Sequence, residues 1–318
     1  MLSRPSSDPL HWLHCGLQAS LDSMTSTRVL NDKPDWERDA QAWPNRQYSR
    51  FLEAGGLRWH VQIAGEGPVL LLIHGTAAAN HSWGALLPLL AKQYCVIAPD
   101  LPGHGFTSAP DPARLSLPGM AAALKALLLA LDQSPQVAVG HSAGAAILAR
   151  MCLDGQIDPQ LFVSLNGALL PLRGLPGKVF SPVAKLLARS SLVPRIVGHD
   201  AKRQGAVERL VDSTGSHLDA RGVALYRLLV SSPGHVAAAL NMMANWNLDS
   251  LARDLPRLQC NLLLLVGSQD QTIPPSEAER LHRLLPGARI QRLDGLGHLA
   301  HEEQAETVAQ AILNFPAC

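Results

Sequence analysis

VAVGHSAGAA, residues 137–146, joins an apolar run to a segment rich in small residues. The first half is typical of a buried strand, and the second half, which continues to Gly155, is typical of a helix. Ser142 lies between them in a G-x-S-x-G pattern, whose small residues allow a sharp turn that presents the serine hydroxyl. The pattern alone recurs by chance, but the strand expected before it and the helix expected after it strengthen the case for a catalytic serine. We predict that Ser142 is a nucleophile rather than an ordinary turn serine.

Further apolar runs on both sides of this turn predict a mostly parallel sheet. Strands buried on both faces are expected in PVLLLIHG (68–75), YCVIAPD (94–100), QVAVGHS (136–142), LFVSLNG (161–167) and NLLLLVGSQD (261–270). Residues 288–298 form a more alternating, edge-like strand, and residues 51–65 form a hairpin around Gly55-Gly56. Helical patterns lie between the runs, at 81–93, 115–132, 143–155 and 276–287. This alternation predicts an α/β fold with helices on both sides of the sheet.

The alternation stops between about residues 167 and 250, where helical segments follow one another without a strand. We predict that this insertion is a helical cap between two parts of the core, 46–166 and 251–318, with a poorly defined extension at 1–45. Within the cap, SSPGHVAAALNMMANW (231–246) has Ser232 as a plausible N-cap and Pro233 at the first helical position.

A nucleophilic serine needs a histidine base held by a carboxylate, and in this arrangement the chain order is serine, acid, histidine. Asp270 ends the run NLLLLVGSQD, and His298 follows the last strand in GLGHLAH. Both lie where strands feed loops, at the edge where open α/β sheets place their sites. We therefore predict the triad Ser142, Asp270 and His298. Asp270 could instead cap a following helix, and His301 is one of several competitors for the base.

Two backbone N–H groups are needed to stabilise the oxyanion of an acyl-transfer intermediate. Ala143, directly after the nucleophile, should supply one, and Thr76 or Ala77 in the turn after PVLLLIHG should supply the other. An ordinary strand-to-helix turn at Gly75 is the alternative. Two tryptophans, two methionines and a histidine are candidates for the wall of a substrate pocket, although such residues more often pack in a core. They are Trp83, His141, Met242, Met243 and Trp246.

Composition excludes several classes of protein. The 318-residue chain has a net charge of +1, which gives no reason to expect nucleic acid as a partner. Its five cysteines are scattered without a CxxC pair or a zinc-like spacing, so we expect reduced thiols, no metal and no cofactor. No apolar run reaches the roughly 20 residues of a membrane span, and the N-terminal stretch lacks a secretory pattern. These features predict a cytoplasmic protein.

From about residue 49 onward the chain resembles the α/β-hydrolase superfamily, through IHG, APDLPGHGFT (98–107), GHSAG, VGSQDQTIP and GLGHLAHEE. A narrower resemblance is to the family of magnesium chelatase accessory proteins encoded with bacteriochlorophyll biosynthesis genes. It is carried by WPNRQYSRFLEAGGLRWHVQ, SLPGMAAALKALL, GHSAGAAILARM, SLNGALLPL and SPGHVAAALNMMANW, some of which fall in the cap. This resemblance implies a role in tetrapyrrole metabolism.

The predicted cap is more basic than the rest of the chain. Residues 167–250 carry ten Lys or Arg against five Asp or Glu, a balance of +5 within a chain of net charge +1. The basic residues are Arg173, Lys178, Lys185, Arg189, Arg195, Lys202, Arg203, Arg209, Arg221 and Arg227. They could form a solvated helix face, attract an anionic substrate such as a carboxylated tetrapyrrole, or dock peripherally against an anionic membrane.

The leading hypothesis from these residues is hydrolysis of a small-molecule carboxylic ester, with a tetrapyrrole as one candidate, through an acyl-enzyme on Ser142. A second hypothesis is a tetrapyrrole-binding accessory protein that contacts and assists magnesium chelatase with little or no turnover. A third is a lyase that uses the same three residues.

Overall fold

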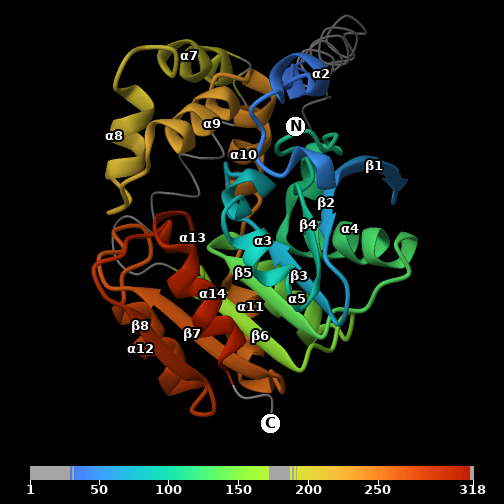
Figure 1. Ribbon diagram of the computed structural model, residues 1–318, viewed down its shortest axis with the longest axis vertical. Helices are drawn as coiled ribbons and strands as arrows, with labels where there is room; N and C mark the ends of the chain where they lie inside the picture. Colours follow the sequence, from blue (N-terminus) through green and yellow to red (C-terminus); the bar gives the residue numbers. More distant parts are fainter. Residues whose placement is uncertain (1–28, 31, 172–186, 188–189, 191, 316–318) are drawn as a thin grey trace, which may run out of the picture.

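The computed structural model describes residues 29–30, 32–171, 187, 190 and 192–315. These residues contain one eight-stranded sheet with helices packed around it (Figure 1). The strand order is β1-β2-β4-β3-β5-β6-β7-β8. The strands are β1 (Ser49–Ala54), β2 (Leu57–Ala64), β3 (Val69–Ile73), β4 (Cys95–Pro99), β5 (Val137–His141), β6 (Leu161–Leu165), β7 (Asn261–Gly267) and β8 (Arg289–Leu293). β2 is antiparallel to β1 and β4, and the other pairs are parallel, so the predicted sheet is confirmed.

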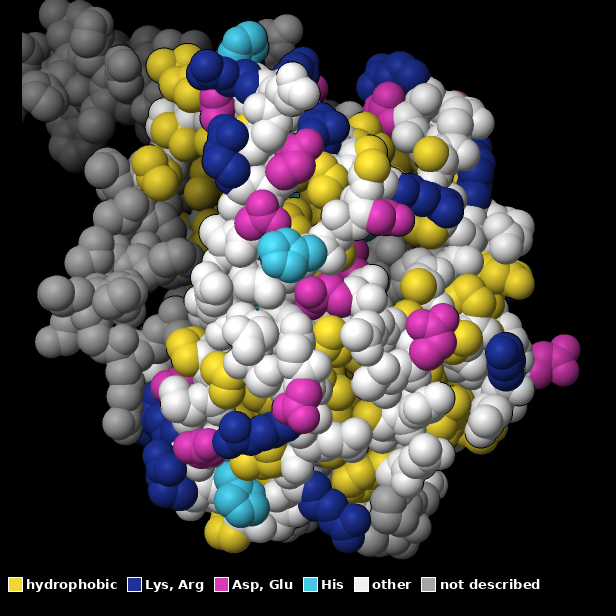
Figure 2. Space-filling model, turned by 60° about the vertical axis from the view of Figure 1, so that its left-hand side comes forward, with side chains coloured by type: hydrophobic (Ala, Val, Ile, Leu, Met, Phe, Trp, Pro, Cys, Tyr) yellow, Lys and Arg dark blue, Asp and Glu magenta, His cyan; other side chains and the backbone are white. Residues whose placement is uncertain are grey.

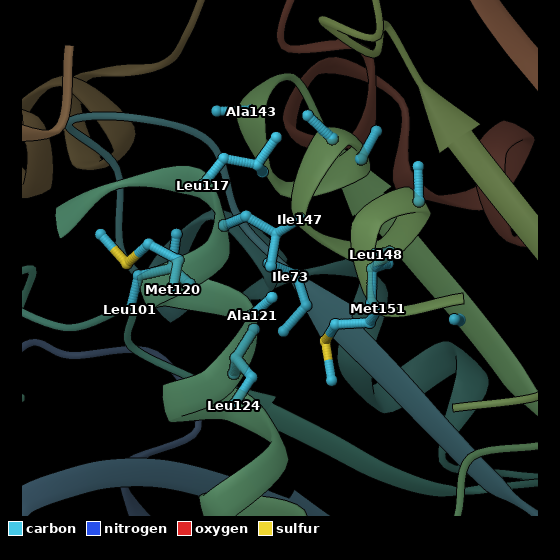
Figure 3. Packing of buried hydrophobic residues seen from close by; sticks show 14 of the residues in the cluster. Ile73, Leu101, Leu117, Met120, Ala121, Leu124, Ala143, Ile147, Leu148 and Met151 are labelled. Atoms are coloured by element: carbon cyan, nitrogen blue, oxygen red, sulfur yellow. The ribbon is translucent and has the colours of Figure 1, made fainter. Parts of the chain in front are cut away.

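The central strands are buried on both faces because helices cover both. In β3, Leu71 and Ile73 pack toward α4 (Leu117–Ala130) and α5 (Ala143–Leu153), whereas Leu70 and Leu72 pack toward α3 (Leu86–Leu90) and α14 (Ala305–Leu313). This follows from the two-residue period of a strand. Figure 3 shows apolar side chains of α4 and α5 meeting around Ile73. Each such fully buried leucine or isoleucine stabilises the fold by about 1.5–3 kcal/mol.

One predicted helix, at 81–93, is divided in two. The chain forms the 3₁₀ turn η2 (Asn80–Trp83) and then the short helix α3. Pro88 explains the division. A proline is tolerated only in the first turn of a helix, because it has no N–H to donate to the carbonyl four residues earlier. That carbonyl, Gly84 O, accepts a hydrogen bond from Asn45 Nδ2 at 2.9 Å instead.

Four helices between β6 and β7, α7 to α10, extend beyond the carboxyl ends of the strands, and we call them the cap helices (Figure 1). They are α7 (Val193–Asp200), α8 (Ala206–Asp212), α9 (Ala220–Val230) and α10 (Pro233–Ala244). Pro233 begins α10 and Ser232 is its N-cap residue, as predicted, but the Ser232 hydroxyl donates to Asp32 O and does not cap the helix. No single described helix is long and apolar enough to span a membrane; α9 and α10 pass that test only together, across a bend of 82°.

The remaining elements are short or lie against the sheet. They are α2 (Trp36–Asp39), η1 (Arg46–Tyr48), η3 (Pro112–Leu115), α11 (Asp249–Asp254), η4 (Leu255–Arg257), α12 (Ser276–Leu284) and α13 (Ala300–Glu303).

The described residues between 29 and 45 pack onto the fold, although their sequence shows little periodicity. Val29 and Leu30 are buried in the core beside the sheet. Gly234 N–H donates to Asp32 O at 2.7 Å, and Trp43 Nε1 donates to Asn80 Oδ1 at 2.9 Å. Isolated apolar residues and backbone bonds leave no periodic pattern, which explains why this part of the predicted extension at 1–45 had no recognisable structure.

A buried carboxylate ties the loop after β4 to β2 and η2. Asp100 accepts hydrogen bonds from His60 Nδ1 at 2.7 Å, Asn80 N at 2.7 Å and Phe106 N at 2.9 Å. Burial alone would raise the pKa of Asp100, but the electrostatic effect and hydrogen bond of His60, together with the effect of His74 and the Asn80 N–H, hold that pKa well below its usual range. Asp100 therefore stays ionised inside the fold.

A second buried carboxyl links cap helix α9 to the core. Glu302 Oε1, on α13, accepts hydrogen bonds from Tyr226 Oη of α9 at 2.6 Å and Ser82 Oγ of η2 at 2.8 Å. Burial raises the pKa of Glu302 to about 7, against the opposing effect of these two donors, and the neighbouring Glu303 adds to the rise. The protonation state of this contact therefore changes near neutral pH.

We predict that Asp100→Ala lowers the free energy of unfolding by about 3–5 kcal/mol, since it leaves buried donors without their acceptor. Urea denaturation followed by circular dichroism measures the change. Asp200→Ala is the control, because Asp200 pairs with Arg203 on the surface and its loss should cost less than about 1 kcal/mol. Equal losses for the two variants would contradict the role of Asp100.

We predict that the wild type loses stability relative to Glu302→Gln as pH rises from about 5 to about 8. The folded-state pKa of Glu302 lies above the unfolded value, so its stabilising effect is complete below the unfolded pKa and is lost as pH rises through about 7. Thermal unfolding of both proteins across this range tests the prediction. Parallel Tm curves would show that Glu302 does not titrate there.

Candidate functional site

The turn at Ser142 is strained in the way that a nucleophile elbow requires. Ser142 has φ 52° and ψ −119° between β5 and α5, a left-handed region that side chains other than glycine rarely adopt. Any Cβ at Gly144 would collide with the backbone at Ile73 O, so only glycine lets α5 approach β3. Ser142 N–H donates to Leu165 O at 3.1 Å, which secures the turn to β6.

The predicted oxyanion turn lies against the elbow. A Cβ on Gly75 would come within 2.9 Å of Ser142 Cβ, so Gly75 permits this close approach. Ala77, two residues later, is a second strained position, with φ 62°. Thr76, Ala77 and Ala143 all border the same cavity as Ser142. Strain concentrated at adjoining turns is typical of functional sites.

Two buried histidines that the sequence did not single out hold this turn. His74 Nε2 accepts from Leu101 N–H, so its Nδ1–H donates to Gly75 O at 2.7 Å. By the same logic His235 Nδ1, on α10, accepts from Gly105 N–H, and its Nε2–H donates to Ala77 O at 3.1 Å. Burial lowers the pKa of both rings, that of His235 to about 3, so both remain neutral and keep one donor and one acceptor.

The base and acid candidates meet across 28 residues of chain. His298 Nδ1 lies 2.8 Å from Asp270 Oδ2, and both side chains are nearly inaccessible to solvent. The other carboxylate oxygen, Oδ1, accepts from the backbone N–H groups of Thr272 and Ile273, each at 2.8 Å. Asp270 thus closes its own turn, but it does not cap α12, which begins at Ser276 and has no side-chain cap.

His301, the competing histidine, lies elsewhere. Its Nε2 is 2.6 Å from Ser82 Oγ, and burial lowers its pKa to about 3. Its ring packs between those of Trp83 and His141. His301 is therefore a structural residue of this buried layer, and of the two candidates for the base only His298 borders the cavity among the described residues.

A cavity of about 840 Å³ connects Ser142 and His298, a volume within the usual range of small-molecule sites. The core contributes His141, Ser142, His298 and Leu299, and α8 and α9 contribute Leu210, Val211, Tyr226 and Val230. The last turn of α10 and the segment that follows it close one side, with Met243 and the residues from Ala244 to Asp249, including Trp246. Most of this wall is apolar.

The structure places two predicted pocket residues in the core. Trp83 is fully buried and stacks on His301, and Met242 is fully buried with its sulfur 3.6 Å from Thr76 Oγ1. Neither is among the described residues that line the cavity, whereas His141, Met243 and Trp246 are. Met242 and Met243 point to different sides of α10 because successive helical residues are separated by about 100°.

The basic side chains of the cap do not contribute to the described wall. Asp249 is the one Asp, Glu, Lys or Arg among the described lining residues. Arg203 and Arg227 pair with Asp200 and Glu208, and Figure 2 shows cationic and anionic side chains interspersed on that face of the molecule. Arg173, Lys178, Lys185 and Arg189 lie outside the described residues.

Within the described ranges, no group of three or more His, Cys, Asp or Glu side chains is arranged to hold a metal ion.

His141 donates through Nε2 to His298 O at 2.9 Å, and burial keeps its pKa well below the usual histidine value. His141 therefore joins the end of β5 to the His298 loop.

Related proteins match most of the chain. The chain is 38% identical over 276 residues, 86% of its own length, to the magnesium-chelatase 30 kDa subunit of Rhodobacter capsulatus, of which 96% is covered. It is 29% identical over 273 residues, 81% of its length, to a pimeloyl-[acyl-carrier protein] methyl ester esterase of Xanthomonas axonopodis pv. citri, covering 98% of that protein.

Among solved structures, an α/β hydrolase fold protein from Burkholderia ambifaria superimposes with a TM-score of 0.72 at 22% identity, covering 84% of this chain and 98% of that one. This likeness shows the fold. The model of the alpha/beta hydrolase family matches residues 70–311, which contain the elbow, the cap helices and the Asp270–His298 pair. The chain therefore belongs to the α/β hydrolase family.

Proposed function

We propose that this protein is a serine hydrolase that cleaves a carboxylic ester through an acyl-enzyme on Ser142. The observation that carries the proposal is the buried His298–Asp270 hydrogen bond, which orients the imidazole at the wall of the cavity that Ser142 also lines. Because Nδ1 carries the proton shared with Asp270, Nε2 is left as the base.

In the first step His298 Nε2 takes the Ser142 proton as the oxygen bonds to the ester carbonyl carbon. The bond to the alcohol oxygen then breaks, and His298 returns the proton to that oxygen. Water, deprotonated by the same nitrogen, attacks the acyl carbon; the bond to Ser142 Oγ then breaks, His298 returns the proton to that oxygen, and the acid is released. Ala143 N–H and a backbone N–H of Thr76 or Ala77 stabilise the oxyanion in both steps.

The described wall favours a large and mostly apolar ester. Leucine, valine, methionine and tryptophan side chains surround the space, and the sole carboxylate, Asp249, disfavours an anionic group nearby. We propose a tetrapyrrole ester as the physiological substrate, a choice supported by the extensive similarity to the magnesium-chelatase 30 kDa subunit. A pimeloyl ester esterase among the relatives is consistent with ester chemistry.

The same similarity favours one other candidate, an accessory protein that binds a tetrapyrrole and contacts magnesium chelatase without turnover. Cytoplasmic location and contact with a membrane through the cap stay predictions from the sequence.

We predict that Ser142→Ala abolishes labelling by a fluorophosphonate probe and that Asp270→Asn lowers kcat/KM on a p-nitrophenyl ester by about 10⁴-fold, because His298 loses its orienting acceptor. Asp212→Asn is the matched control. Its partner His217 forms a similar His–Asp pair at 3.0 Å, but on the surface. Undiminished labelling of Ser142→Ala, or equal activity in both aspartate variants, would contradict the proposal.

We predict that wild type, but not Ser142→Ala, restores pigment synthesis in a bacteriochlorophyll-producing strain that lacks its magnesium-chelatase 30 kDa subunit. Hydrolysis requires the hydroxyl, whereas binding in an apolar cavity does not. Pigment absorbance and immunoblots of both proteins provide the measurement. Full restoration by Ser142→Ala would favour the accessory role.

A further inference from the structure

Asn166 connects the two loops that carry the acid and the base. It follows β6 directly, and its side chain is 3% exposed. Its Nδ2 donates to Gly297 O and to His298 O, each at 2.9 Å, while its Oδ1 accepts from Gly267 N–H at 2.8 Å. Gly267 ends β7, three residues before Asp270. One carboxamide thus joins both loops.

Every polar atom of this carboxamide has a partner. An asparagine side chain offers two N–H donors and an acceptor oxygen, and here both donors and the acceptor are used in a buried setting. The backbone of Asn166 has φ 46°, a conformation that asparagine tolerates better than most residues. A residue held in a strained conformation with its whole polar group engaged indicates a demanding geometric role.

The backbone around Asn166 reaches the nucleophile as well. Ser142 N–H donates to Leu165 O at 3.1 Å, and Ala168 N–H donates to Ser142 O at 3.0 Å. Asn166 N–H itself donates to Leu265 O in β7. The turn after β6 therefore contacts the segments of all three candidate catalytic residues.

Other contacts hold the His298 loop from different sides. Glu303 Oε2 accepts from Gly297 N–H at 2.8 Å, and Ser216 Oγ accepts from Leu299 N–H at 2.8 Å. These bonds fix the N–H groups on either side of His298. The His298 carbonyl, by contrast, is held by Asn166 and His141, and of these two only Asn166 also bonds the end of β7.

We propose that Asn166 is a positioning residue that sets the His298 imidazole relative to Asp270 and Ser142. The inference rests on the proposed function, since it assigns the base of that reaction its geometry. Asn166 fixes the peptide plane of His298 through its carbonyl, and the peptide plane fixes the direction of the side chain. Displacement of the reacting group by about 1 Å can reduce a rate by about 10²-fold.

Asn166→Gly removes the side chain and keeps a residue that accepts φ 46°. The matched control is Asn45→Gly, because Asn45 also has a positive φ of 56° and donates to a backbone carbonyl, Gly84 O, outside the cavity wall. We expect Asn166→Gly to lower kcat by about 10²-fold with KM changed less than about threefold, and Asn45→Gly to retain both constants.

A proton NMR measurement separates this inference from hydrolysis itself. The downfield resonance of His298 Nδ1–H, identified by its loss in His298→Ala, should shift or broaden in Asn166→Gly and remain in Asn45→Gly. If wild type does not hydrolyse esters but the resonance still responds only to Asn166→Gly, the proposed function fails and the positioning role stands. An unchanged resonance together with unchanged kcat in Asn166→Gly would overturn the positioning role.

Asn166→Asp provides a second variant that preserves the shape of the side chain and the acceptor for Gly267 N–H. It replaces the two N–H donors with an oxygen facing two carbonyls. We expect it to lose activity at least as severely as Asn166→Gly while it keeps the native circular dichroism spectrum. Wild-type kcat and an unperturbed His298 resonance in this variant would also overturn the inference.

Discussion

The left-handed backbone at Ser142 is the constraint on which the site depends. A serine at φ 52° is unfavourable in isolation, so the surrounding structure must over-determine it. Two features do this: glycine at position 144 lets α5 pack directly on β3, and backbone bonds join Ser142 to the strand and turn of β6. The apolar cores on both faces of the sheet provide the free energy that keeps this turn in place.

Neutral, buried histidine side chains support the loops around Ser142 and His298. His74, His141 and His235 each use a ring nitrogen on a backbone carbonyl of a site loop, and burial lowers the pKa of each. A protonated ring would lose its acceptor nitrogen and place a charge in an apolar interior. The loops therefore keep one arrangement over the pH range in which a serine–histidine pair would work.

The cap helices form one side of the cavity beside Ser142. They enclose a space large enough for a sizeable apolar molecule, and Tyr226 fastens α9 to the core through Glu302. Burial raises the pKa of the Glu302 carboxyl that makes this contact to about 7, whereas the pKa of Asp100 is held well below its usual range. The contact between α9 and the core therefore changes its protonation state near neutral pH, whereas Asp100 stays ionised.

The sequence by itself determined the mostly parallel sheet, the elbow at Ser142 and the candidacy of Asp270 and His298. Such features have local signals, namely apolar runs, small residues at a sharp turn and polar residues after strands. Only the tertiary structure decided that Met243 faces the cavity while Met242 and Trp83 pack in the core, and that the described residues between 29 and 45 belong to the fold. It alone also revealed Asn166, His74 and His235 as supports of the site loops. The physical reason is that a side chain's hydrogen-bond partners and the direction in which it points depend on segments that are distant in the chain, more than a hundred residues away for Asn166 and His235, and no local pattern in the sequence records them.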